Sequence, residues 1–123
     1  MKQATRKPTT VGDTLLYEYL EPLNLKINEL AEMLHVHRNS ISALVNNKRK
    51  LTTDMAFRLS KAFDTTVDFW LNIQAAVDLW EIENDMRAQE EFSRIMSVKI
   101  YLDNRNEQHS SMTQLRQEYS NDS

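Results

Sequence analysis

The sequence predicts an all-α protein. Its 123 residues include one glycine and two prolines, while 41% are hydrophobic and 27% are charged. Long alternating runs of β-branched residues, from which sheets are built, are missing, whereas apolar residues recur at helical spacing. A chain of this length forms one domain, or one domain with a tail. We divide it into a flexible basic arm (1–10), a five-helix domain (11–82) and an acidic helical extension with a polar tail (83–123).

The first helix is expected from about Gly12 to Leu20, with Pro22 stopping it. Its apolar face consists of Leu15, Leu16, Tyr19 and Leu20.

The next two helices form a pair around a short turn. The first, over 27–34, follows from apolar residues at i, i+3, i+4 and i+7, which are Ile27, Leu30, Ala31 and Leu34. The second, over 38–46, has a shorter stripe of Ile41, Leu44 and Val45. Helices that share a core across so short a turn must cross steeply, which leaves one face of the second helix uncovered.

Two capped helices complete the domain. Thr52 is expected to cap a helix over 54–63 with Asp54 in its first turn. That helix buries Met55, Ala56, Leu59 and Phe63. Thr65 or Thr66 caps the fifth helix, which is apolar on more than one side through Val67, Phe69, Trp70, Leu71, Ile73, Val77, Leu79 and Trp80. This is more apolar surface than a domain of this size covers, so we expect a homodimer, with additional core as the alternative.

Two features lie outside this pattern. Because glycine is scarce, Asn24 and Asn47 are expected to take the left-handed conformation in which helices commonly end. In the extension, Phe92, Ile95, Met96, Val98, Ile100, Tyr101 and Leu102 predict a helix that continues to about Asn104. The polar segment 106–123 is expected to be loose.

The uncovered face of helix 38–46 carries the chemistry. If Ile41, Leu44 and Val45 point inward, the outward residues are Arg38, Asn39, Ser42, Ala43 and Asn46. A helix fits the DNA major groove, where arginine pairs with guanine and asparagine with adenine, each good pair discriminating by about 1–3 kcal/mol. Lys48, Arg49 and Lys50 follow where the chain would pass the sugar–phosphate backbone. The alternative is a helical hairpin whose polar face is merely solvated.

Charge is divided unevenly along the chain, whose overall net charge is −3. Residues 1–63 hold ten Lys/Arg and six Asp/Glu, a net charge of +4, and residues 64–123 hold five and twelve, a net charge of −7. This division predicts one polyanionic partner and one basic partner. The alternative for the acidic part is a surface that only aids solubility.

Catalytic and membrane functions are not expected. His35 and His37 lack further metal ligands nearby, and the run Glu81, Glu83, Asp85 lacks the glycine-bent loop of a calcium site. There is no Gly-rich phosphate loop and no HExxH motif, so we expect neither an enzyme nor a cofactor. The chain has no cysteine, no apolar run of about 18 residues and no apolar signal core. We expect a cytoplasmic protein.

From about Val11 to Trp80 the chain resembles the HigA-type antitoxins, a branch of the phage-repressor-like (XRE/Cro) helix-turn-helix regulators. The matching residues are Gly12-Asp13, Glu29-Leu30-Ala31, Val36 to Leu44, Lys48, Leu51-Thr52, Met55-Ala56, Arg58-Leu59 and Asp68-Phe69-Trp70-Leu71-Asn72. By position, Arg38, Asn39, Ser42 and Ala43 correspond to the family's groove-reading face, and Asn46, Asn47 and Lys48 to its backbone-contacting end.

The resemblance implies a dimer that binds a palindromic operator in double-stranded DNA at its own promoter. It also implies neutralisation of a basic, mRNA-cleaving toxin. Three helix ends depart from the family: Lys26 and His37 stand where small polar caps are usual, and Asn47 replaces a common glycine.

Three functions therefore remain open on sequence grounds. The first is an autorepressor that also sequesters a toxin, and the second is a stand-alone dimeric regulator. The third is an interaction adaptor that uses the same fold without reading DNA.

Overall fold

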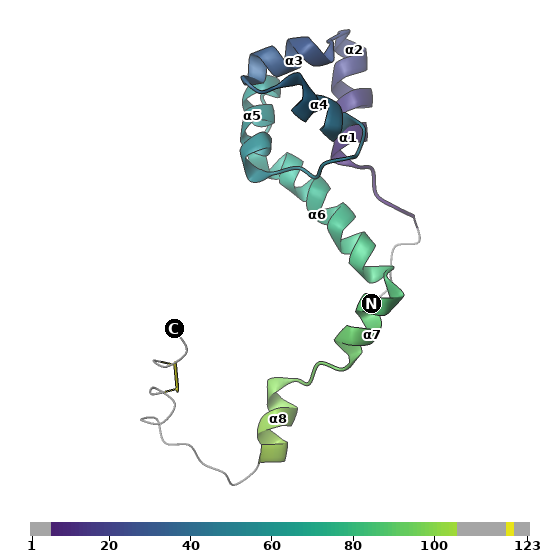
Figure 1. Cartoon of the computed structure of the whole chain (residues 1–123), viewed down its shortest axis with the longest axis vertical. Coiled ribbons are helices and arrows are strands. Elements are labelled where there is room, and N and C mark those ends of the chain that lie inside the picture. The colour runs from purple at the N-terminus through teal and green to yellow at the C-terminus, as the bar shows by residue number, and fades with distance from the viewer. Residues whose placement is uncertain (1–5, 106–117, 120–123) are drawn as a thin grey trace. The chain divides into compact units, whose positions relative to one another are not determined.

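The computed structural model describes residues 6–105 and 118–119, and the regular structure within these ranges is helical (Figure 1), which confirms the all-α prediction. Its contacts divide the chain into two units, Met1–Gln89 and Glu90–Ser123. The first unit contains the helices expected of the five-helix domain. The boundaries of that domain at residues 11 and 82 stay a prediction.

The first helix is longer than expected because it passes through Pro22. It comprises α1 (Val11–Thr14), a π-helical segment η1 (Leu15–Leu20) and α2 (Glu21–Leu23). In an α-helix the Pro22 ring would meet the carbonyl of Glu18, four residues earlier. In the wider π turn, the Glu21 N–H donates to the Leu16 carbonyl five residues back. The helix therefore ends at Leu23, and the expectation that Pro22 stops it at Leu20 was wrong.

The start of α1 lies very close to the end of α4 (Arg38–Val45). Thr10 caps α1, with its Oγ1 accepting a hydrogen bond from the Asp13 N–H at 3.0 Å. Gly12 is buried, and a Cβ at this position would overlap the Leu44 carbonyl oxygen and stand 2.7 Å from Asn47 Oδ1. Only glycine permits this approach, which is how α1 holds the C-terminal end of α4.

The helix pair has the expected bounds, with α3 spanning Ile27–Leu34 and α4 following after a three-residue turn. His35 adopts a left-handed conformation, and the Val36 N–H returns to the Ala31 carbonyl at 3.0 Å. Arg58 of α5 (Thr53–Phe63) donates through Nη1 to the Leu34 carbonyl at 2.7 Å, and its Nε lies 2.6 Å from Asp54. The turn is thus closed by its own backbone and by a cation at the end of α3.

Helices α5 and α6 (Val67–Glu83) begin at the expected caps, Thr52 and Thr66. Thr65 does not cap the helix, because its Oγ1 accepts a hydrogen bond from Trp70 Nε1 at 2.7 Å. The Trp70 ring is completely buried and packs with Tyr19, Phe63 and Phe69 at centroid distances of 5.3, 6.2 and 5.0 Å. Large aromatic surfaces of this kind dominate the energetics of a small core.

One apolar core joins these helices. Its buried members are Val11, Leu15, Leu20, Leu30, Ala31, Leu34, Ile41, Leu44, Val45, Leu51, Ala56, Leu59 and Trp70. Asn24 and Asn47 have φ values of 53° and 58°, as expected of helix ends, and His35 and Asp64 share this conformation at 57° and 56°. These four residues take the role that glycine commonly has at helix ends.

The extension is not one continuous helix. α6 ends at Glu83, α7 spans Met86–Ser93 and α8 spans Val98–Arg105. Asp85 caps α7 by accepting from the Ala88 N–H at 3.1 Å, and the Ser97 hydroxyl accepts from the Ile100 N–H at 3.2 Å. Each polar side chain that opens a new helix competes with continuation of the previous one. The seven apolar residues of the extension are all exposed, and the predicted loose tail lies almost entirely outside the described residues.

The close contact at Gly12 predicts that Gly12→Ala destabilises the protein, although Gly→Ala usually stabilises a helix. In an open helix, Gly→Ala stabilises by up to about 1 kcal/mol because alanine is the better helix former. Here the added methyl group would push α1 away from the Leu44 carbonyl, so we expect Gly12→Ala to lower the free energy of unfolding by about 1–3 kcal/mol. Urea unfolding followed by circular dichroism measures this, and a stabilised variant would show that α1 does not press on α4.

Candidate nucleic-acid interface

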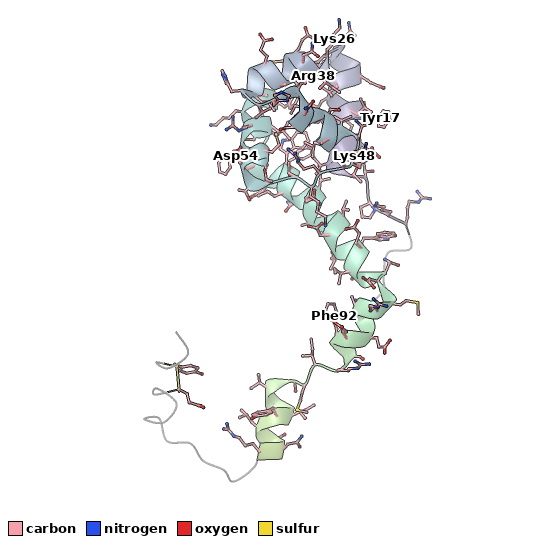
Figure 2. The ribbon with its side chains drawn as sticks, in the orientation of Figure 1. Tyr17, Lys26, Arg38, Lys48, Asp54 and Phe92 are labelled. Carbon is pink, nitrogen blue, oxygen red and sulfur yellow. The ribbon has the colours of Figure 1, made fainter. Side chains whose placement is uncertain are left out.

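The rotation of α4 about its axis is the one that the sequence pattern requires. Ile41, Leu44 and Val45 are 0%, 3% and 7% exposed. Arg38, which is labelled in Figure 2, and Asn39 are exposed, and Ser42 and Ala43 are half-buried. The helix therefore presents a continuous outer face of one guanidinium, one amide and two small side chains.

Histidine caps the start of α4. His37 has extended backbone, and its Nδ1 accepts a hydrogen bond from the Asn39 N–H at 3.1 Å. The imidazole takes the place of the usual serine or threonine oxygen, and it does so only with Nδ1 unprotonated. At the start of α3, the Lys26 side chain contains no hydrogen-bond acceptor. Its backbone N–H instead donates to Glu29 Oε1 at 2.9 Å. Both departures from the family pattern thus leave a partly satisfied helix start.

Asparagines shape the end of α4. Asn46 Nδ2 donates back to the Ser42 carbonyl at 2.8 Å, and Asn47 Nδ2 donates to Asp13 Oδ1 at 3.2 Å. The left-handed Asn47 lets the Lys48 N–H reach the Ala43 carbonyl at 2.8 Å. These bonds fix the path of the chain as it leaves the helix, and both asparagine side chains remain exposed.

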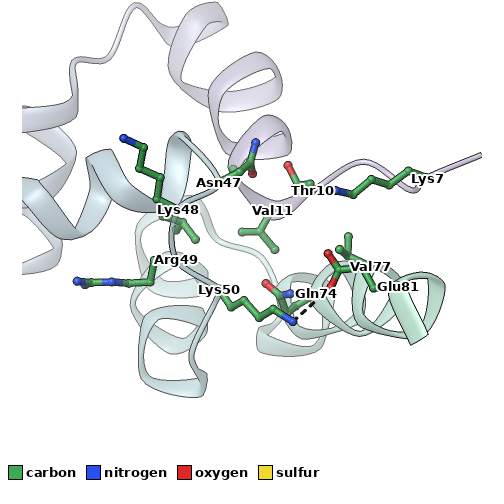
Figure 3. Close-up of a pocket in the computed structure, with 12 residues that line it drawn as sticks. Lys7, Thr10, Val11, Asn47, Lys48, Arg49, Lys50, Gln74, Val77 and Glu81 are labelled. Atoms are coloured by element: carbon green, nitrogen blue, oxygen red, sulfur yellow. Dashed lines mark hydrogen bonds and ion pairs between the residues drawn. The ribbon is translucent and has the colours of Figure 1, made fainter. Parts of the chain in front are cut away.

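The three consecutive cations after α4 diverge. Lys48 and Arg49 extend to one side of the loop (Figure 3). Arg49 Nη1 donates to Ser40 Oγ of α4 at 3.2 Å. Lys50 extends the other way, where its Nζ lies 2.9 Å from Asp78 Oδ1 and 3.4 Å from Glu81 Oε1 on α6. The expectation that Lys50 meets the sugar–phosphate backbone together with its two neighbours is therefore not supported by its placement.

Ionisation of this cluster is favoured on both sides. The hydrogen bond and charge of Asp78 raise the pKa of Lys50, with Glu81 adding to the effect. The hydrogen bond from Lys50 lowers the pKa of Asp78. The shifted groups are charged over the whole neutral range, although the exposure of all three side chains screens their attraction.

Gln74 is a structural residue that the sequence prediction missed. Its Oε1 accepts a hydrogen bond from the Leu51 N–H at 2.9 Å, and its Nε2 donates to Asp78 Oδ1 at 3.0 Å. One amide therefore ties the loop after α4 to α6 and also orients the carboxylate that holds Lys50. The signal was present in the sequence: Gln74, Asp78 and Glu81 stand at i, i+4 and i+7, which places them on one face of the helix.

This loop, the start of α1 and the middle of α6 enclose a cleft of about 240 Å³. Lys7, Lys48, Arg49 and Lys50 contribute cations to it, and Glu81 an anion. Within the described residues no cluster of three or more histidines and carboxylates is arranged to hold a metal ion. Over the same ranges no helix is long and apolar enough to cross a membrane.

Helix α6 leaves apolar surface open near both of its ends. Leu79 and Ile82 are exposed near its end, and Phe69 is exposed near its start, where it also borders a second, shallow cavity of about 480 Å³ beside Pro8. The Trp80 ring is half-buried with Lys7 Nζ 5.9 Å from its centroid, and its Nε1 finds no acceptor among the described residues. The homodimer expected from this helix stays a prediction.

Comparison with known proteins also identifies a helix-turn-helix in the segment that contains α3 and α4. The family described as Helix-turn-helix matches residues 16–70. YbaQ, an uncharacterised HTH-type transcriptional regulator of Escherichia coli (strain K12), is 78% identical over 107 residues, which cover 87% of this chain and 95% of that protein. Antitoxin HigA-1 of Vibrio cholerae is 40% identical over 100 residues, covering 81% and 94%.

A similar fold has been solved with DNA. The structure of the Pseudomonas aeruginosa antitoxin HigA with the higBA promoter superposes with a TM-score of 0.67 at 27% sequence identity. The match covers 75% of this chain and 99% of that one.

The histidine cap predicts that the start of α4 depends on one nitrogen. We expect His37→Ala to lower the free energy of unfolding by about 0.5–2 kcal/mol, because the Asn39 N–H loses its acceptor. His37→Asn is the matched control, since its carbonyl oxygen supplies an acceptor at a position where asparagine is a favoured cap. Thermal or urea unfolding at neutral pH compares the three proteins. Equal stability of wild type and His37→Ala would contradict the cap.

Proposed function

The chain belongs to the XRE-type helix-turn-helix family of DNA-binding regulators, and from this premise we propose that it is a dimeric repressor that reads a palindromic operator with α4. We further propose that the operator lies in its own promoter and that the protein is the antitoxin of a toxin–antitoxin pair. The observation that carries the proposal is the rotation of α4, which buries Ile41, Leu44 and Val45 and turns Arg38 and Asn39 outward.

Base reading is assigned to the outer face of α4. The Arg38 guanidinium can donate two parallel hydrogen bonds to guanine, and the Asn39 amide can both donate to and accept from adenine. Ser42 and Ala43 lie one turn further along, where small side chains let the helix approach base edges closely. The Ala43 methyl group is of the right kind to contact a thymine methyl.

Backbone contacts are assigned to the end of α4 and the loop after it. Asn46, Asn47, Lys48 and Arg49 are exposed there, and the two cations extend to the same side. Such contacts position a domain on DNA and supply affinity without sequence information.

Dimerisation is assigned to the exposed apolar residues of α6, because a palindrome is read by two copies related by a two-fold axis. Leu79 and Ile82 are three residues apart on α6, so their exposed side chains share one face of the helix, and Phe69 adds a third exposed apolar side chain near the start of the same helix.

The toxin partnership is supported by charge and by relatives. Residues 64–123 carry a net charge of −7, which suits a basic partner. HigA-1 of Vibrio cholerae is named an antitoxin, and the Pseudomonas aeruginosa HigA is an antitoxin solved with the higBA promoter. The second candidate is a stand-alone regulator, favoured by the 78% identical YbaQ, which is described only as a transcriptional regulator.

Selection of bound sequences from random duplex DNA tests the proposal, and a recovered palindrome supports it. On the selected site, Arg38→Ala should weaken binding by about 1–3 kcal/mol and relax the choice of base at one position in each half-site. Lys48→Ala or Arg49→Ala should instead weaken binding to all duplexes and flatten the dependence of log Kd on log salt by about one unit per contact. Fluorescence anisotropy with labelled selected and random duplexes measures both effects.

Lys61→Ala is the matched control, because it removes one exposed positive charge from α5, outside α4 and the loop that follows it. Binding that is sequence-independent in the wild type, or unchanged by all three substitutions, rules out this face as the reader and favours the adaptor.

Antitoxin and stand-alone regulator differ in their partner. If the antitoxin proposal holds, a small basic protein encoded next to this chain should co-purify with it, and co-expression should restore growth that the neighbour alone arrests. Charge-neutralising substitutions after Asp64 should weaken that complex, while Arg38→Ala should leave it intact. If no neighbouring frame encodes such a protein, the stand-alone regulator is the correct form of the proposal.

A further inference from the structure

We propose that Asp78 and Glu81 of α6 limit DNA affinity by holding Lys50 away from the duplex, so that the two carboxylates compete with a backbone phosphate for one ammonium group. The inference rests on the DNA-binding function proposed above. It goes beyond that function because it assigns an opposing role to residues of a helix that does not read DNA.

The geometry of the loop supports a competition. Lys48, Arg49 and Lys50 are consecutive, yet only Lys50 turns toward α6 (Figure 3). Its Nζ lies 2.9 Å from Asp78 Oδ1 and 3.4 Å from Glu81 Oε1, so two of its three donor positions are occupied by carboxylates. No carboxylate among the described residues forms an ion pair with Lys48 or Arg49.

Lys50 is held but not buried. Its side chain is 66% exposed, and those of Asp78 and Glu81 are 46% and 43% exposed. Exposed ion pairs contribute little to folding, with a typical value of about 0–1 kcal/mol. A lysine on a flexible four-carbon stem can therefore leave this pair at small cost and reach a nearby anion.

The carboxylate of Asp78, in contrast, is fixed in place. Gln74 Nε2 donates to the same Asp78 oxygen that Lys50 contacts, at 3.0 Å, and Gln74 Oε1 holds the Leu51 N–H. Asp78 is half-buried on a long helix, so it does not follow the lysine outward. One partner of the pair is anchored and the other is mobile, which is the arrangement that a competition for the lysine requires.

The test is the DNA affinity of Asp78→Asn/Glu81→Gln. Both substitutions keep the shape of the side chain, and the amide that replaces the Asp78 carboxylate retains an oxygen for Gln74. The probe is a labelled random-sequence duplex of about 24 base pairs, because a phosphate contact does not depend on sequence. Anisotropy titrations over a range of KCl give the affinity and its salt slope. Each released Lys50 should steepen the slope by about 0.9 and tighten binding by up to roughly eightfold per subunit at about 0.1 M salt.

Two controls separate this effect from a general loss of negative charge. Glu32→Gln/Asp68→Asn removes the same charge from exposed carboxylates that pair with no cation in the described part of the chain. The second control repeats Asp78→Asn/Glu81→Gln in a Lys50→Met background. The proposal requires that Asp78→Asn/Glu81→Gln binds the duplex more tightly than the wild type and that Glu32→Gln/Asp68→Asn changes the affinity less. In the Lys50→Met background the additional tightening should be absent.

Other results overturn it in distinct ways. If the wild type binds the duplex and the gain persists in the Lys50→Met background, the carboxylates act through the general field and the inference fails while the proposed function stands. Weaker binding by Asp78→Asn/Glu81→Gln means that the pair positions the loop for DNA, which also refutes a competition. If the wild type does not bind duplex DNA at all, the proposed function and the inference fail together.

Discussion

The burial of Ile41, Leu44 and Val45 fixes the direction in which every other side chain of α4 points. Exposing one such side chain costs about 1.5–3 kcal/mol, so no rotation of this short helix about its axis is tolerated. Two further contacts act on the same helix: Gly12 admits α1 against its last carbonyls, and Arg58 closes the turn that precedes it. The outward residues need no interactions of their own to be well placed. Their arrangement is inherited from the core, which leaves their chemistry free for a partner.

Electrostatics then divides a run of three similar residues into two groups. Composition alone makes Lys48, Arg49 and Lys50 equivalent, but α6 carries carboxylates within reach of only the third. The same helix supplies Gln74 to the loop and apolar side chains to the surface. Helix α6 thus connects the loop that follows α4 with the surface expected to meet a second subunit, and a change at either end has a physical route to the other.

Sequence reasoning succeeded where a local pattern determined the answer. The apolar stripes of α3 and α4, the threonine caps at 52 and 66, and the left-handed Asn24 and Asn47 all follow from short-range rules. It missed outcomes that depend on geometry that the pattern does not contain. Pro22 is accommodated by a change of hydrogen-bond register, and His37 caps α4 through a ring nitrogen. Lys50 turns toward Asp78, which lies 28 residues further along the chain. The close approach at Gly12 was equally hidden, because nothing in the surrounding sequence shows that two carbonyls lie against it.

The four left-handed residues have a consequence for how this chain tolerates mutation. Asn24, His35, Asn47 and Asp64 each hold a conformation that costs a residue with a side chain about 1–2 kcal/mol relative to glycine. In a deep mutational scan of a helical protein, glycine is ordinarily among the most damaging replacements. At these four sites the ranking should reverse, with glycine best accepted and valine or isoleucine worst. A chain that contains a single glycine therefore has unused stability at its helix ends, accessible without any change to its core.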